Sequence, residues 1–252
     1  AHWFDRVLAL APDLLPARSA RFQHPESLVH NSAIAEAAFL VRWREGLAYF
    51  ERAAPMEAHK RKYFGPTLTN ATNFYLHYLG EPFLDEQRRH AAVVQRMARE
   101  LLPDLQRPLP KPAPRDRMRV GFVSCHLRRH TITKLMSGFM LGLDRDRFEV
   151  CAFHVDDRED SVTAGLRSSV DRFESGERDP GAWARLLHGA GLDALVYLDI
   201  GMDPTMQVLA SLRIAHLQCA LWGHPVTSGF EHIDWFLSVA SMETKDGPAH
   251  YH

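Results

Sequence analysis

The chain has 252 residues, of which 46% are hydrophobic and 24% charged, so it is long enough for one large domain or two modest ones and has the composition of a folded protein. Its 30 Lys and Arg balance 31 Asp and Glu, so the net charge of -1 favours neither nucleic acid nor an anionic membrane as a partner. The 3 widely spaced cysteines argue against a secreted disulfide framework, and no apolar run approaches the roughly 18 residues that span a bilayer, which favours the cytoplasm.

The first hundred residues predict helices. Apolar residues recur at helical spacing in segments 3–10 and 34–47, and further helical patterns cover 70–79 and 83–102. Prolines fall between these patterns, where they end helices without breaking them. We therefore expect an all-helical module at the start of the chain.

A proline-rich segment, 102–114, follows the helical patterns. Its five prolines alternate with Lys and Arg, a composition that favours extended backbone and disfavours helix. We place a domain boundary here, with a helical module and linker at 1–115 and a second domain at 116–252.

The hydrophobic pattern of the second domain has a different period. Short apolar runs predict buried strands, and longer amphipathic stretches between them predict crossover helices. Such an alternation predicts a doubly wound, Rossmann-like α/β domain with a parallel sheet. The expected strands are 120–123, 148–155, 194–200, 217–222 and 235–239, and the expected helices are 132–143, 182–190 and 204–212.

The loop after the first expected strand concentrates basic and hydroxyl side chains. Ligands of open α/β sheets bind beyond the carboxyl ends of the strands, and helix N-termini favour anions, so we predict an anion cradle here. Thr131 or Thr133 would cap the following helix. A solvated basic loop is the alternative. The loop contains neither GxGxxG nor a Walker A pattern, which disfavours NAD binding and P-loop NTPase chemistry. The candidate binding residues are His126, Arg129, His130, Thr133 and Lys134.

Two later loops at the same sheet edge carry further candidates. One begins at Gly201, and the other, segment 223–229, brackets hydroxyl residues with two glycines. Such a loop can bring its backbone close to a ligand, and its histidine can exchange a proton near neutral pH. A structural turn with a satisfied histidine is the alternative. The candidates are Gly201, Gly223, His224, Pro225, Thr227, Ser228 and Gly229.

One pair of histidines has the spacing of a metal site. His126 and His130 have H-x-x-x-H spacing next to Cys125, but the segment is an expected loop and no third ligand has matching spacing, so we predict no metal. Asp199 and Asp203 are candidate acid–base carboxylates. Equally, they could serve only in a strand-end turn and as a helix cap.

Taken together, segments 119–124, 129–131, 199–204 and 218–229 resemble the O-linked N-acetylglucosamine transferase (SPINDLY-type) glycosyltransferases, especially their bacterial branch. The resemblance covers roughly 118–252. It implies a GT-B fold of two Rossmann-like halves, of which this chain carries the first. The opening residues are similar to the tail of a tetratricopeptide repeat, and such repeats present protein acceptors in the family.

The resemblance also implies an activity. It is the inverting, metal-independent transfer of a sugar, N-acetylglucosamine, from a UDP donor to Ser or Thr of a protein acceptor, with no cofactor. His130 matches the family histidine that lies near the reacting centre and is discussed as a general base, and segment 223–229 matches the loop that lines the cleft. The family's diphosphate-binding elements have no match here, so we expect a fragment that is inactive alone.

Two other classes stay open. One is a non-catalytic scaffold in which helices and a degenerate α/β domain bind proteins. The other is a relative of the nucleotide-sugar epimerases of GT-B fold, which would need no module for presenting protein acceptors.

Overall fold

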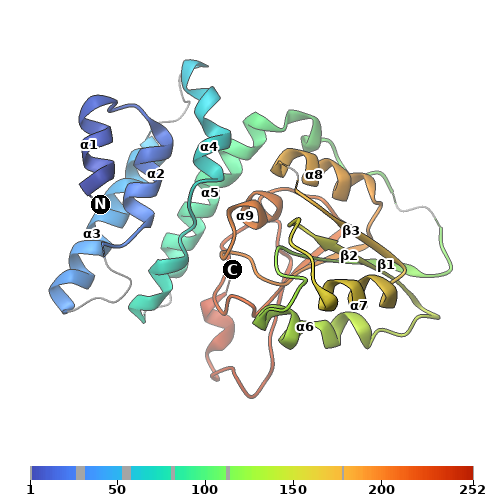
Figure 1. Ribbon diagram of the computed structural model, residues 1–252. Helices are drawn as coiled ribbons and strands as arrows, with labels where there is room; N and C mark the ends of the chain where they lie inside the picture. Colours follow the sequence, from blue (N-terminus) through green and yellow to red (C-terminus); the bar gives the residue numbers. More distant parts are fainter. Residues whose placement is uncertain are drawn as a thin grey trace.

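The computed structural model describes residues 2–26, 32–52, 58–80, 83–111, 114–177 and 179–251. Within these ranges, a helical part is followed by an α/β part, and the two lie side by side (Figure 1). Pro112, one of the five prolines of the expected boundary, lies outside the described residues. No helix in the described ranges is both long and apolar enough to cross a membrane.

In the described part of the chain, three of the four expected helices are confirmed, and two further α-helices and two 3₁₀ helices are added. Segment 70–79 is helical only in its second half, as a short 3₁₀ helix. Helix α2 was not predicted; it begins with a proline in its first turn, where the missing N–H costs no helical hydrogen bond. The elements are α1 (His2–Leu10), α2 (Leu15–Gln23), α3 (Ala33–Arg52), η1 (Ala58–Tyr63), α4 (Phe64–Leu68), η2 (Phe74–Leu79), α5 (Leu84–Leu101) and η3 (Pro103–Gln106).

The α/β part is built on a six-stranded, fully parallel sheet of order β3-β2-β1-β4-β5-β6, which confirms the doubly wound prediction. The strands are β1 (Met118–Ser124), β2 (Phe148–His154), β3 (Arg172–Ser175), β4 (Ala194–Tyr197), β5 (Leu217–Leu221) and β6 (Trp235–Leu237). The helices are α6 (Thr131–Leu141), α7 (Ser161–Ser169), α8 (Pro180–Gly189) and α9 (Pro204–Ala210), with η4 (Gly247–His250) near the end.

The order of the strands locates the ligand crevice. The chain winds from β1 outward to β3, then returns to the other side of β1 at β4, so the winding direction changes between β1 and β4. Figure 1 shows α6 and α7 on one face of the sheet and α8 and α9 on the other. In such sheets the crevice opens at the carboxyl ends of the two strands at the switch point.

The edges of the sheet differ from the sequence prediction. Segment 235–239 does not form a buried strand: Trp235 is 63% exposed and Leu237 is 40% exposed, because β6 has a neighbour on one side only. On the opposite edge, β3 is half-buried throughout. An edge strand is not covered on both faces, so it does not need a continuous apolar sequence.

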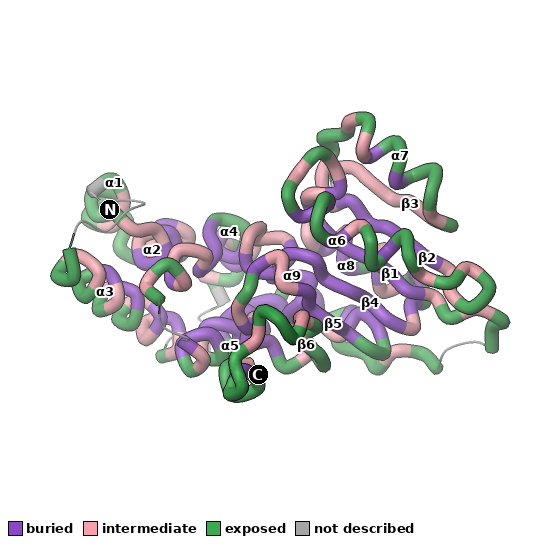
Figure 2. Tube along the Cα trace, turned by 90° about the horizontal axis from the view of Figure 1, so that it is seen from below, coloured by how far each residue is buried: buried purple, intermediate pink, exposed green. Residues whose placement is uncertain are grey.

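One hydrophobic core joins the helical part to the α/β part. It contains Trp43 and Met97 from α3 and α5 together with Trp183 and Leu209 from α8 and α9. In Figure 2 the buried segments continue from α5 through α9 into the sheet. Gln207 of α9 donates hydrogen bonds to the backbone carbonyls of Leu68, the last residue of α4, and of Ala71. The secondary structure changes near residue 115, but one core spans both parts, and the two-domain division stays a prediction.

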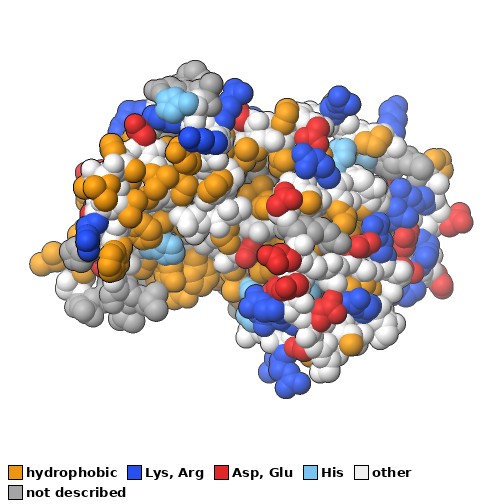
Figure 3. Space-filling model, turned by 45° about the horizontal axis from the view of Figure 1, so that its top comes forward, with side chains coloured by type: hydrophobic (Ala, Val, Ile, Leu, Met, Phe, Trp, Pro, Cys, Tyr) orange, Lys and Arg blue, Asp and Glu red, His pale blue; other side chains and the backbone are white. Residues whose placement is uncertain are grey.

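Side chains of different kinds gather over the two parts. On the face in Figure 3, hydrophobic side chains cover much of the helical part, and charged side chains concentrate over the α/β part. The exposed apolar residues of the first three helices include Trp3, Leu10, Ile34 and Val41.

Candidate functional site

The loop between β1 and α6 opens onto a hollow of about 620 Å³ at the carboxyl end of β1. Four of the predicted site residues meet there: Arg129, His130, Thr133 and Lys134. The hollow therefore combines cationic side chains with the N-terminus of an 11-residue helix, an arrangement that favours an anion. Its lining residues are Arg128, Arg129, His130, Thr131, Thr133, Lys134, Ser137 and Val162.

His130 caps helix α6. Its backbone is extended, and its ring Nδ1 accepts a hydrogen bond from the backbone N–H of Ile132 at 3.2 Å. The predicted threonine caps were therefore wrong, because Thr131 and Thr133 already lie inside the helix. The Thr133 hydroxyl instead donates to the carbonyl of His126 and holds the loop against the helix.

His126 stacks on His130, with ring centroids 4.0 Å apart and the planes inclined by 13°. Burial, together with the neighbouring His130 and Arg128, lowers the pKa of His126 to about 4. Burial and Arg128 also lower the pKa of His130. Both rings are therefore neutral at neutral pH, and the positive charge of the hollow comes from its arginines and lysine.

The cap fixes the tautomer of His130. A neutral imidazole whose Nδ1 accepts a hydrogen bond carries its proton on Nε2. In this arrangement His130 can donate a hydrogen bond from Nε2. To take a proton at Nε2, the ring must first move its own proton to Nδ1 and release the N–H of Ile132.

The second predicted loop forms a separate, buried cluster against the helical part. His224 is only 7% exposed; its ring lies 4.4 Å from that of His77 and stacks on Phe74. Thr227 and Ser228 line the same enclosed space of about 10 Å³, roughly one water molecule in size. Gly201, His224, Thr227 and Ser228 are thus brought together, but not into the hollow that contains His130, and Pro225 is exposed.

Close packing accounts for the three predicted glycines. A Cβ on Gly223 would lie 1.9 Å from the carbonyl oxygen of Leu198, and one on Gly229, where φ is +72°, would lie 2.5 Å from the carbonyl of Gln87. A Cβ on Gly201, where φ is +98°, would lie 2.8 Å from the His224 ring. These contacts explain the glycines without a ligand, so the geometry favours the structural-turn alternative for this loop.

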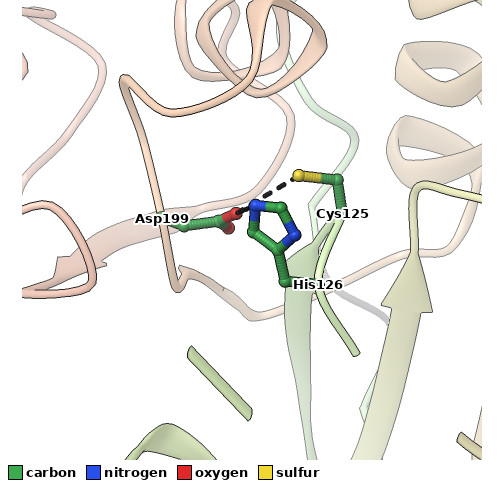
Figure 4. Close-up of side chains that lie close together, drawn as sticks. All are labelled: Cys125, His126 and Asp199. Carbon is green, nitrogen blue, oxygen red and sulfur yellow. Dashed lines mark hydrogen bonds and ion pairs between the residues drawn. The ribbon is translucent and has the colours of Figure 1, made fainter. Parts of the chain in front are cut away.

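Asp199 follows β4 and is fully buried beside the first loop (Figure 4). Its Oδ2 accepts a hydrogen bond from the thiol of Cys125 at 3.3 Å and lies 3.6 Å from Nε2 of His126. Burial raises the pKa of Asp199 to about 7, and it raises the pKa of the Cys125 thiol far above its usual range. Asp203, by contrast, accepts a hydrogen bond from the backbone N–H of Thr205 at 2.7 Å and caps α9. The helix cap, one of the two roles predicted for Asp203, is therefore confirmed.

The cluster of Cys125, His126 and Asp199 was not predicted. Cys125 and Asp199 are 74 positions apart, so no local spacing links them. The available signal was that each residue follows a predicted strand, and that β1 and β4 are neighbours in the sheet.

The order of the sheet and the crevice at its carboxyl edge define a Rossmann-like α/β fold. No protein-family model matches the chain, and no curated protein matches it. Among solved structures, the chain is similar to a mutant of the Thermobaculum terrenum O-GlcNAc transferase, with 22% identity and a TM-score of 0.50 over 98% of this chain. The chain spans 51% of the length of that protein. This likeness supports the expected Rossmann-like fold of GT-B type; tetratricopeptide repeats in the helical part stay a prediction.

Proposed function

We propose that the chain is the first lobe of a GT-B glycosyltransferase that moves N-acetylglucosamine from a UDP donor to Ser or Thr of a protein acceptor, with inversion and without a metal ion in the reaction. The hollow carries this proposal, because His130 and three cationic side chains meet a helix N-terminus at the switch point of the sheet. The likeness of the fold to a solved O-GlcNAc transferase supports it.

The chemistry of sugar transfer makes two demands that the hollow can meet. The acceptor hydroxyl must lose a proton, and the departing UDP must be stabilised. The cations of Arg128, Arg129 and Lys134 and the amides of α6 suit the phosphates or an acidic acceptor segment. In the proposal, His130 contacts the reacting hydroxyl and takes its proton at Nε2, after its own ring proton has moved to Nδ1 and the N–H of Ile132 has been released.

The proposal assigns only part of the catalytic unit to this chain. Because the chain spans about half of the solved transferase, we propose that a second lobe supplies most of the UDP contacts and that the isolated chain does not transfer sugar. Its three cysteines are free and buried, which fits the reducing cytoplasm where we place the protein.

A transfer assay with labelled donor tests the proposal. The product of the complete reading frame is incubated with labelled UDP-N-acetylglucosamine and an acceptor protein, and labelled UDP-glucose serves as the competing donor. We expect the N-acetylglucosamine label on Ser or Thr with the complete product and no label above background with the 252-residue chain. If the complete product transfers sugar from neither donor, the proposal is contradicted. If it binds the acceptor tightly without transfer, the protein-binding scaffold is favoured.

A further inference from the structure

We infer that Cys125, His126 and Asp199 form a binding site for a zinc-like divalent metal ion at the junction of β1 and β4. One potential ligand atom from each residue lies within 4.8 Å of the other two. The site is distinct from the proposed transfer chemistry, which uses no metal. A bound ion would link the loop after β1 to the end of β4.

Two of the three distances in the cluster suit tetrahedral coordination, and the third lies within 4.8 Å. Metal–ligand bonds of 2.0–2.3 Å at tetrahedral angles place the ligand atoms about 3.3–3.8 Å apart. Oδ2 of Asp199 lies 3.3 Å from the Cys125 sulfur and 3.6 Å from Nε2 of His126. In Figure 4 the three side chains, from two different loops, converge on one point. A small adjustment of the thiol and the ring is therefore enough to surround an ion.

The burial of Asp199 is a second, independent reason to infer a ligand. Its side chain is fully buried beside the side chain of Ser124, and Oδ1 has no hydrogen bond of normal geometry among the described residues. A buried carboxylate oxygen without a partner costs free energy, which a bound cation would offset. Cys125 is 4% exposed and belongs to no disulfide, so its sulfur is free to bind an ion.

The set of ligand atoms selects the class of metal. Thiolate, imidazole and carboxylate together suit Zn²⁺, whereas Mg²⁺ and Ca²⁺ prefer oxygen ligands alone. Three protein ligands leave one tetrahedral position for water. The His126 side chain keeps 16% of its surface exposed, so the cluster is not sealed from solvent.

The structure also explains why the spacing around Cys125 and His126 did not identify this set of ligands. His130, the second histidine of the H-x-x-x-H pattern, uses Nδ1 to cap α6. The third ligand comes instead from Asp199 on the neighbouring strand end. A metal bound here would hold the loop after β1 to the end of β4 and thereby stabilise the floor of the hollow.

Cobalt substitution tests the inference on the 252-residue chain. The chain is stripped of metal, kept reduced and titrated with Co²⁺, and the near-ultraviolet band of thiolate-to-cobalt charge transfer is recorded. We expect one Co²⁺ per chain with this band. Cys125→Ser, which keeps a donor to Asp199, should lose the band, and Asp199→Asn should weaken Co²⁺ binding at least about tenfold. Zn²⁺ should displace Co²⁺ and abolish the band.

Cys219→Ser is the matched control, because Cys219 is another buried thiol that lies outside the cluster. It should keep the band and the stoichiometry. The inference is overturned if the wild-type chain binds Co²⁺ without the band, or if Cys125→Ser keeps it. Circular dichroism of each metal-free variant checks its folding. If a variant fails to fold, the wild-type chain decides the question, through the cobalt band and a Zn²⁺-dependent rise in its Tm. Absence of both signals in the wild-type chain overturns the inference.

Discussion

The ring Nδ1 of His130 accepts the backbone N–H of Ile132 at 3.2 Å, and this bond ties the proposed catalytic histidine to the start of helix α6. Replacing His130 therefore changes two things at once, the helix cap and the imidazole that faces the hollow. A useful experiment must separate them.

Asparagine separates the two roles, since it is a good N-cap but has no imidazole. We expect His130→Ala to lower the free energy of unfolding by about 1 kcal/mol and to remove most transfer. His130→Asn should recover the stability but not the transfer. Urea unfolding and labelled-sugar transfer by the complete protein measure both effects. If His130→Asn transfers at the wild-type rate, His130 is only a cap.

The cations of the hollow give a second prediction. Arg129 and Lys134 are exposed, so replacing both with Gln should leave Tm unchanged. The KM for the UDP-sugar should rise at least about tenfold, because each hydrogen bond to a charged group contributes about 1.5–3 kcal/mol. Lys111→Gln is the control, because Lys111 is an exposed cation outside the hollow and should leave KM unchanged. Equal effects of the two changes would argue against a specific anion site.

The sequence predicted the central strands because they are buried on both faces and read as unbroken apolar runs. It did not predict β3, where Phe173 is the one apolar residue among charged and polar neighbours. The order of the strands depends on tertiary packing, so it could not be read from local patterns.

The sequence predicted the position of the candidate site but not all of its contacts. The hollow follows from the rule that ligands bind at the carboxyl ends of parallel strands, and four of the five candidates of the first loop line it. The cap by His130 was missed because histidine is not a usual N-cap residue. The contact of Asp199 with Cys125 depends on which strands become neighbours, and no local pattern encodes that.

The packing of segment 223–229 gives a third prediction. Gly223→Ala should destabilise the chain by about 3 kcal/mol or more, because its Cβ would overlap the backbone oxygen of Leu198 and neither group is at the end of a flexible side chain. Gly165→Ala in α7 is the control: nothing lies within 4 Å of the added Cβ, so helix propensity should raise stability by about 0.5–1 kcal/mol. Urea midpoints measure both, and similar midpoints for the two variants would contradict the close approach.

The buried histidines between the helical part and the sheet predict a loss of stability in acid. Burial lowers the pKa of His90 and His224 to about 4 and that of His77 to about 3. Between the ordinary pKa of about 6.5 and these values, the unfolded chain binds protons that the folded chain does not, so stability falls as pH falls. For a pKa of about 4, the loss between pH 7 and pH 5 is about 2 kcal/mol per residue.

His90→Gln tests this pH dependence, because glutamine removes one titrating ring and does not ionise. We expect the free energy of unfolding, measured in urea at pH 7 and pH 5, to fall by about 2 kcal/mol less in His90→Gln than in the wild-type chain. His216 is exposed, so His216→Gln should leave the wild-type pH dependence in place. If both variants keep the full dependence, His90 is not held neutral by its burial, and the acid sensitivity must come from other groups.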